Sequence, residues 1–297
     1  MSLRKELEEK MQAWRQYFED VLQEYLQNTR LQPSVLNDSF RYSLLLGGKR
    51  VRPVLMFACA QTLGGKPGDV SRLALALEMI HTYSLIHDDL PAMDNDDFRR
   101  GQPSSHKKFG EGQAILAGDA LLNEAYAICL EACRGGRTYL EASAYLCRCA
   151  GAHGMVAGQA ADLGWQGRED AGPADLDFII LNKTARMLMA AAAVPAYVYG
   201  LDRNIADLMA EFGKDLGFLF QITDDILDVV GDFAKLGKTP GKDAAEDKLS
   251  AVSVYGLEKA QALADRYADL CVQVLDQLPY ESGLLREFVA MVRARQA

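Results

Sequence analysis

The stretch IADLMAEFGKDLGFLFQITDDILDVVG (205–231) carries the pattern that decides the fold. Its apolar residues recur three and four positions apart, which is the period of an amphipathic α-helix and not the strict alternation of a strand. The same period returns along most of the chain, and β-branched runs with a period of two are nearly absent. The sequence therefore predicts an all-α protein.

Glycines and prolines divide the chain into helical segments joined by short connections. No low-complexity linker separates them, so we predict a single domain over residues 1–297, a bundle of about ten helices or more. Some of these helices are apolar on nearly every side, which is typical of helices inside a layered bundle. The predicted helices are Leu3–Gln27, Ser34–Leu46, Pro53–Leu63, Val70–Leu90, Gly112–Cys133, Arg137–Cys149, His153–Leu163, Pro173–Tyr199, Ile205–Gly231, Leu249–Leu278 and Ser282–Arg295.

The overall composition excludes several classes of protein. The chain has 32 Lys and Arg against 41 Asp and Glu, a net charge of −9, with no basic cluster, so nucleic acid is not an expected partner. The longest apolar stretch, Met187–Leu201, is too short to cross a bilayer of about 30 Å, so no membrane span is expected. Residues 1–20 lack a signal-peptide pattern, and the six cysteines lack zinc-site or secreted-framework spacing. We therefore expect reduced thiols and a cytoplasmic location.

Two clusters of aspartates lie at the ends of otherwise apolar predicted helices. In the second cluster, Asp224, Asp225 and Asp228 share an arc of about 100° with Gln221 when placed on a helical wheel. Like charges on one helical face repel, and on an apolar helix they are costly unless a cation neutralises them. One such cluster alone could be a solvated helix end, but two together indicate a metal site.

The first cluster consists of Asp88, Asp89 and Asp94. Oxygen ligands favour Mg²⁺ or Ca²⁺ over Zn²⁺, but a calcium-binding loop needs glycine at its sixth position, where Arg99 stands when counted from Asp94. Mg²⁺ prefers a few protein carboxylates together with substrate phosphates. We therefore predict Mg²⁺ and a phosphorylated small-molecule substrate between the two clusters. Pro91 should bend or end the helix between Asp88 and Asp94, so that both can reach one ion.

Basic residues accompany the aspartates and could hold a second phosphate group, because the guanidinium fork matches phosphate oxygens. Arg99 and Arg100 follow the first cluster, and Lys49 and Arg52 lie in a glycine-containing loop upstream. His81 lies seven residues before Asp88, on the same helical face. Taken alone, the upstream segment reads as an ordinary helix–turn–helix with a solvated basic loop.

At this point the sequence resembles the trans-isoprenyl diphosphate synthases. The resemblance rests on segments in the same order over nearly the whole chain: GGKRVRP (47–53), SLIHDDLPAMDNDDFRRG (84–101), GQ..D (158–162), KT (183–184), FQITDDILD (220–228) and GKTPGKD (237–243). The four residues between Asp89 and Asp94 are similar to the spacing in bacterial farnesyl diphosphate synthases. The resemblance implies an all-α bundle around a central apolar cavity.

Residue by residue, the resemblance also implies roles for the site. Three Mg²⁺ ions would bind Asp88, Asp89, Asp94, Asp224, Asp225 and Asp228. An allylic diphosphate would contact Arg99, Lys183, Thr184 and Lys238, with Gln221 near the developing cation. Isopentenyl diphosphate would bind Lys49, Arg52, His81 and Arg100, and Lys248 would close on the site. The expected reaction is head-to-tail condensation through an allylic carbocation, catalysed by Asp88, Asp94, Arg99, Lys183, Gln221, Asp224 and Lys238.

The product is expected to be farnesyl diphosphate, C15, with Tyr83 and Ser84 as the residues that limit chain length. Ser84 lies one helical turn before Asp88 and so directly beneath it, whereas the resemblance favours Tyr83, because an aromatic residue five places before the first aspartate is typical of short-chain synthases. Tyr83 could also be a core residue with no role in length. Geranylgeranyl diphosphate synthase is the alternative product class.

Three other readings stay open. A terpene cyclase shares the bundle but normally has a different second motif and lacks the Lys49 and Arg52 segment. A head-to-head synthase uses looser aspartate motifs. An inactive regulatory subunit has typically lost one of the two motifs, and both are intact here. The resemblance further implies a homodimer.

Overall fold

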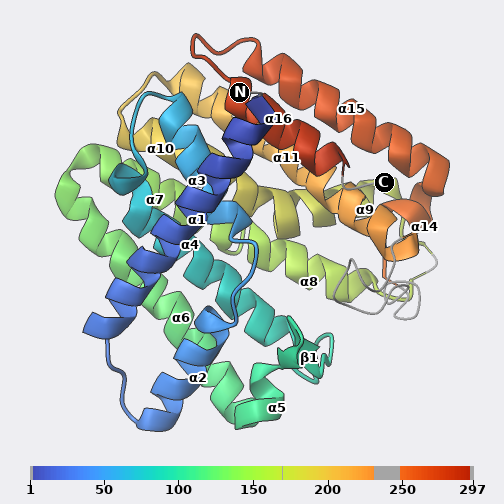
Figure 1. Ribbon diagram of the computed structural model, residues 1–297. Coiled ribbons are helices and arrows are strands. Elements are labelled where there is room, and N and C mark those ends of the chain that lie inside the picture. Colours follow the sequence, from blue (N-terminus) through green and yellow to red (C-terminus); the bar gives the residue numbers. More distant parts are fainter. Residues whose placement is uncertain (1–2, 169, 231–247, 295–297) are drawn as a thin grey trace.

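Helix α11 (Arg203–Val230) corresponds to the predicted helix Ile205–Gly231 and packs against several other helices (Figure 1). The computed structural model describes residues 3–168, 170–230 and 248–294. The elements before α11 are α1 (Leu3–Asn28), α2 (Ser34–Leu45), α3 (Val51–Thr62), α4 (Pro67–Asp88), β1 (Phe98–Arg99), β2 (Gln102–Pro103), α5 (Ser105–Phe109), α6 (Glu111–Ala132), η1 (Cys133–Gly135), α7 (Arg137–Ala150), α8 (Met155–Trp165), α9 (Pro173–Ile179), η2 (Ile180–Ala185) and α10 (Arg186–Val198). After it come α14 (Ala251–Tyr255), α15 (Leu257–Leu275) and α16 (Gly283–Arg293). The prediction of an all-α fold is confirmed.

The interior of the bundle consists of helices that are buried on nearly every side. In α4 every residue from Leu73 to Ile80 is buried, and in α10 the run from Ala190 to Ala196 is buried as well. Helix α4 packs against α6, α3 and α10, while α10 packs against α11 and α7. Because no side of these helices faces water, their apolar sequence reflects burial between layers.

Helix α11 approaches the segment formed by η2 and α10 very closely. A Cβ atom at Gly217 would lie 2.4 Å from the Cα atom of Ala185, and one at Gly213 would lie 2.6 Å from the Cα atom of Met189. Gly213, Gly217 and Gln221 are four residues apart and therefore share one face of α11. The two glycines bring the backbones together, and Gln221 meets the same partner segment one turn later.

The segment from Pro173 to Val198 departs from a uniform α-helix. It was predicted as one helix, and the structure inserts the π-helical element η2 between α9 and α10. A π-helical turn is uncommon and is often found at functional sites. This turn contains Lys183 and Thr184, two of the residues expected in the site.

Pro91 ends α4 as predicted. The helix stops at Asp88, and the chain turns so that the backbone N–H of Asp94 donates to the carbonyl of Asp88 at 2.8 Å.

Three other features differ from prediction. The strands β1 and β2 form a hairpin whose turn residues Arg100 and Gly101 both have positive φ, and α5 follows it. The single helix predicted over 249–278 is instead α14 and α15, interrupted at Gly256 with φ +78°.

One described segment, Pro173–Val198, is long and apolar enough by composition to cross a membrane. Its 26 residues exceed the short span considered from the sequence, but 78% of its most apolar window is buried inside the protein. A core helix of a layered bundle has this composition, and the contacts of α10 with α3, α4, α7 and α11 account for it.

Candidate active site

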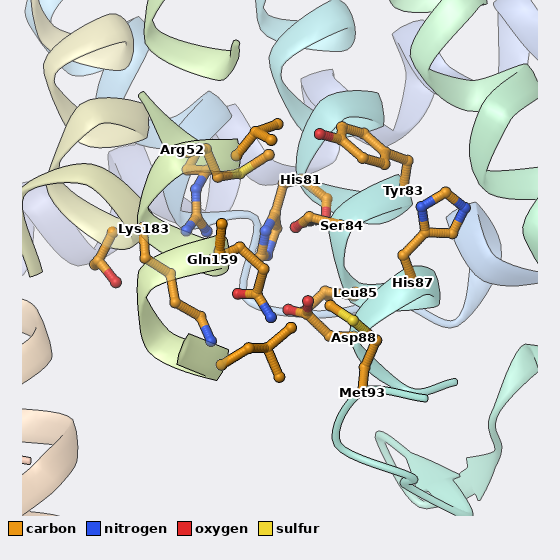
Figure 2. Close-up of a pocket in the computed structure, with 15 residues that line it drawn as sticks. Arg52, His81, Tyr83, Ser84, Leu85, His87, Asp88, Met93, Gln159 and Lys183 are labelled. Carbon is orange, nitrogen blue, oxygen red and sulfur yellow. Dashed lines mark hydrogen bonds between the residues drawn. The ribbon is translucent and has the colours of Figure 1, made fainter. Parts of the chain in front are cut away.

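A cavity of about 380 Å³ lies between α4, α8 and η2 (Figure 2). Helix α4 presents His81, Ser84 and Asp88 to it, at intervals of three and four residues that keep them on one face. Gln159 enters from α8, Lys183 and Thr184 from η2, and Arg52 from the first turn of α3. Apolar residues complete the wall, among them Leu85, Met93, Met155, Val156 and Leu163.

Asp88 lines one end of this cavity, and Asp94 lies close enough for its charge to act on Asp88. The pKa of Asp88 is raised to about 6, chiefly by burial. Among the neighbouring charges, Lys183 lowers this pKa and Asp94 raises it. Asp94 forms an ion pair with Lys248 at 3.1 Å, which places Lys248 beside the first aspartate cluster. A buried carboxylate whose neighbour is also an acid is a position where a bound cation is favourable.

Asp89 faces a different direction from Asp88, because successive helical residues are about 100° apart. It is almost fully buried and accepts hydrogen bonds from Nε of Arg99 at 3.0 and 3.2 Å, with the terminal nitrogen of the same guanidinium also in contact. Arg99 pairs with Asp96 as well, at 3.2 Å. In this structure Asp89 therefore holds Arg99, and its role as a metal ligand stays a prediction.

The second aspartate cluster adjoins the first cavity through a chain of hydrogen bonds. Thr184 Oγ1 donates to Gln221 Oε1 at 2.7 Å, and Gln221 Nε2 donates to Asp225 Oδ1 at 2.8 Å. Asp225 also accepts from the backbone N–H of Ala251, at the start of α14, at 2.7 Å. These groups border a smaller cavity of about 110 Å³ lined by Asp162, Lys183, Thr184, Gln221, Asp225 and Lys248, among others.

The remaining acids of this cluster occupy the same stripe of α11. Asp228 is buried, and the charge of Asp224 acts on Arg52 across the cavity. Within residues 3–168, 170–230 and 248–294, no three acidic, histidine or cysteine side chains are grouped tightly enough to hold an ion by themselves. Such a site fits Mg²⁺, which takes one or two protein carboxylates and completes its coordination with phosphate oxygens and water.

The other side of the cavity is cationic. Arg52 is deeply buried, and burial lowers the pKa of its guanidinium; among the described residues its Nε has no hydrogen-bond partner. The pKa of His81 is held well below its usual value, first by burial and then by Arg52, Arg100 and Arg99. Buried donors without acceptors indicate a place for an anion.

Two predicted basic segments meet at this side. A Cβ atom at Gly48 would lie 2.5 Å from Cζ of Arg100, so the glycine lets the upstream loop touch the guanidinium. Lys49 is exposed on the same loop, whereas Arg50 is buried and paired with Glu19 at 2.7 Å and Glu78 at 3.0 Å. Arg50 therefore anchors the loop to α1 and α4.

Tyr83 and Ser84 both line the cavity, as the prediction about chain length requires. Figure 2 shows Tyr83 at the end away from Asp88, while Ser84 lies between them. The Tyr83 ring packs edge-on against His87 at 5.7 Å, and Nε2 of His87 is 3.1 Å from the carbonyl of Ile115 in α6. Ser84 Oγ donates to the carbonyl of His81 at 3.0 Å.

Gln159 and Asp162 belong to the GQ..D segment, but no role was predicted for either from the sequence. The structure places Gln159 in the cavity, with a buried Nε2 that has no acceptor among the described residues. It pairs Asp162 with Lys183 at 2.5 Å. In the sequence, only the spacing of Gln159 and Asp162 could have indicated that both belong to the site. Lys238 and the whole segment 237–243 that contains it lie outside the described residues, so the predicted role of Lys238 stays a prediction.

The chain is similar to known proteins in sequence and in structure. The family described as "Polyprenyl synthetase" matches residues 33–277. The chain is 45% identical to the "Heterodimeric geranylgeranyl pyrophosphate synthase large subunit 1, chloroplastic" of Arabidopsis thaliana over 79% of its own length, and spans 65% of that relative.

Solved structures match over almost the whole chain. An FPP/GFPP synthase from Zymomonas mobilis has a TM-score of 0.84 and 30% identity, covering 97% of this chain and 99% of that one. A geranyltransferase from Helicobacter pylori, complexed with magnesium and isoprenyl diphosphate, has a TM-score of 0.81 and 32% identity, covering 95% and 96%.

Nε of Arg52, which has no acceptor among the described residues, should contribute to anion binding. Replacing Arg52 with Met should raise the Kd for inorganic diphosphate about ten-fold or more, because a hydrogen bond to a charged group contributes about 1.5–3 kcal/mol. The melting temperature should hold or rise, since a buried N–H group without an acceptor is removed. Isothermal titration calorimetry and calorimetric melting measure these effects. Arg203→Met, which removes an exposed guanidinium paired with Asp207, is the control. Equal affinity in both variants would contradict the anion site.

Proposed function

The chain belongs to the polyprenyl synthetase family, and on that premise we propose that it is a Mg²⁺-dependent prenyltransferase. It would condense isopentenyl diphosphate head-to-tail with an allylic diphosphate. The observation that carries the proposal is a largely apolar cavity lined by Asp88 and Lys183 in one part and by Arg52 and His81 in another, with the charge of Arg100 acting on His81. The proposed reaction has two diphosphate substrates and therefore needs two binding sites, one with metal ions and one with guanidinium groups.

The side chains divide the work of the proposed reaction. Asp88 and Asp94, with Asp224 across the cavity, would bind Mg²⁺, which neutralises the allylic diphosphate and makes it a better leaving group. Lys183 adds a fixed positive charge beside Asp88. The oxygens of Thr184 and Gln221 point toward each other near the position where the allylic cation would form.

The second substrate would be held from the opposite wall. Arg52 and His81 line the cavity and Arg100 acts on His81, and these three side chains would bind the diphosphate of isopentenyl diphosphate and so hold its double bond toward the cation. After the new C–C bond forms, a proton has to leave, and the released diphosphate can accept it. The apolar wall excludes water, which would otherwise quench the cation.

Asp88→Asn tests this assignment. We expect kcat to fall by orders of magnitude, because charge stabilisation of the departing diphosphate is lost, while the melting temperature of the metal-free protein is unchanged or higher. The measurement is incorporation of labelled isopentenyl diphosphate with Mg²⁺ and dimethylallyl, geranyl or farnesyl diphosphate as primer. Asp265→Asn, which breaks an exposed pair with Arg293, is the matched control. Near-normal kcat in Asp88→Asn would refute the ligand assignment, and no product from the wild type with any primer would refute the function.

The length of the product is the finer question. The curated relatives are named geranylgeranyl pyrophosphate synthases, so the comparisons favour the C20 alternative over the farnesyl product expected from the sequence. One feature of the cavity favours C15. Tyr83 fills the end remote from Asp88 and is held there by His87 and α6, so a growing chain would meet a fixed ring. We propose C15 on this geometry, with C20 as the second candidate.

Tyr83→Ala should lengthen the products to C20 or beyond, because the phenol ring no longer closes the cavity, and Ser84→Phe should stop growth near C10. Thin-layer chromatography of the dephosphorylated products gives the chain lengths. Tyr139→Ala, which removes a partly buried tyrosine of α7 that does not line the cavity and whose hydroxyl donates to the carbonyl of Asp69, serves as control. A wild type that makes mainly C20, together with an unchanged pattern in Tyr83→Ala, would establish the second candidate.

We also propose a homodimer, supported by apolar side chains that α6 leaves exposed. Ile115 and Leu116 are 44% and 52% exposed, beside the carbonyl that contacts His87. Size-exclusion chromatography with light scattering should give about twice the 32.7 kDa chain mass, and Leu116→Asp should shift the protein toward the monomer by placing a charge in the apolar contact. A wild-type monomer at micromolar concentration would contradict this proposal.

A further inference from the structure

The ion pair between Asp162 and Lys183 is a largely buried contact of the site, and the proposed reaction assigns no role to Asp162. The carboxylate of Asp162 accepts from Nζ of Lys183 at 2.5 Å, and the two side chains are only 10% and 26% exposed. They come from different elements, α8 and η2, so the pair is a tertiary contact. Lys183 also faces Asp88, across the end of the cavity where the allylic diphosphate would lie.

Helix α8 contacts the backbone of Lys183 as well as its ammonium group. A Cβ atom at Gly158 would lie 2.0 Å from the backbone nitrogen of Lys183 and 2.6 Å from its Cα, so only glycine allows this approach. Gly158 and Asp162 are four residues apart and share one face of α8. The same face therefore fixes the main chain of Lys183 through Gly158 and the tip of its side chain through Asp162.

A long lysine side chain needs such support to act at a defined point. Its ammonium group sits on a flexible four-carbon stem, and fixing that stem costs conformational entropy. Burial by itself lowers the pKa of Lys183, but the charges of Asp162 and then Asp88 raise it above the ordinary value. Asp162 thus keeps the group both charged and in place before a substrate arrives.

We propose that Asp162 is a positioning residue, which holds the Lys183 ammonium group toward the allylic diphosphate and acts through Lys183 without touching the substrate. This inference rests on the proposed function. It differs from two other roles that the same carboxylate could have. As a metal ligand, Asp162 would act independently of Lys183. As a purely structural residue, it would affect stability and both substrates alike.

A double-mutant cycle separates these roles. The variants are Asp162→Asn, Lys183→Met and the double variant, and the readouts are the KM for each substrate and the Kd for inorganic diphosphate with Mg²⁺. We expect Asp162→Asn to raise the KM for the allylic substrate and the Kd for diphosphate about ten-fold, with the KM for isopentenyl diphosphate changed less than about two-fold. On the Lys183→Met background the same substitution should have almost no further effect.

Two more variants complete the design. Asp162→Glu keeps the carboxylate and should recover most of the allylic affinity. If Asp162→Asn does not fold, Asp162→Ser takes its place in the cycle. Asp207→Asn breaks the exposed pair with Arg203 at 2.9 Å and should match the wild type. Additive losses in the cycle, or equal losses for both substrates, would overturn the positioning role. A wild type that condenses no primer would instead show that the proposed function has failed.

Discussion

The close approach of α11 to η2 and α10 is the contact on which the site depends. Side chains at positions 213 and 217 would hold the two backbones apart, and the two glycines remove that obstacle. Once the backbones meet, Gln221 reaches Thr184, and Asp225 reaches Gln221 and the start of α14. The second aspartate cluster is thereby joined to η2 by hydrogen bonds, and η2 is in turn held from its other side by α8 through Gly158. The site is assembled where three helical backbones are in near contact.

The second organising constraint is the separation of charge inside one buried space. The cavity is lined by the carboxylate of Asp88 from α4 and the guanidinium group of Arg52 from α3, and these two groups form no direct ion pair. Several groups remain incompletely satisfied, including Nε of Arg52 and Nε2 of Gln159 within the described chain. Such groups cost stability in the empty protein. The binding of charged ligands would recover that cost, which is how a cavity can favour such ligands in an apolar interior.

Helix α4 combines several roles because its face toward the cavity repeats every three to four residues. Asp88 and Tyr83 lie at opposite ends of the cavity, with Ser84 between them, and His81 lines the same cavity near Arg52. One helix therefore presents both charged and apolar side chains to the same space.

The sequence by itself determined the helical class, most helix positions and the two acidic ends, since these follow from local period and spacing. It also indicated the break at Pro91, because proline cannot continue a helix. It did not indicate the hairpin at Phe98–Pro103, whose strands are two residues long and have no period. Only the tertiary structure decided that Asp89 turns to Arg99 while Asp88 enters the cavity, that Arg50 anchors the loop, and that Asp162 pairs with Lys183. These depend on contacts between helices distant in the chain, and local residue patterns carry no information about which faces will meet.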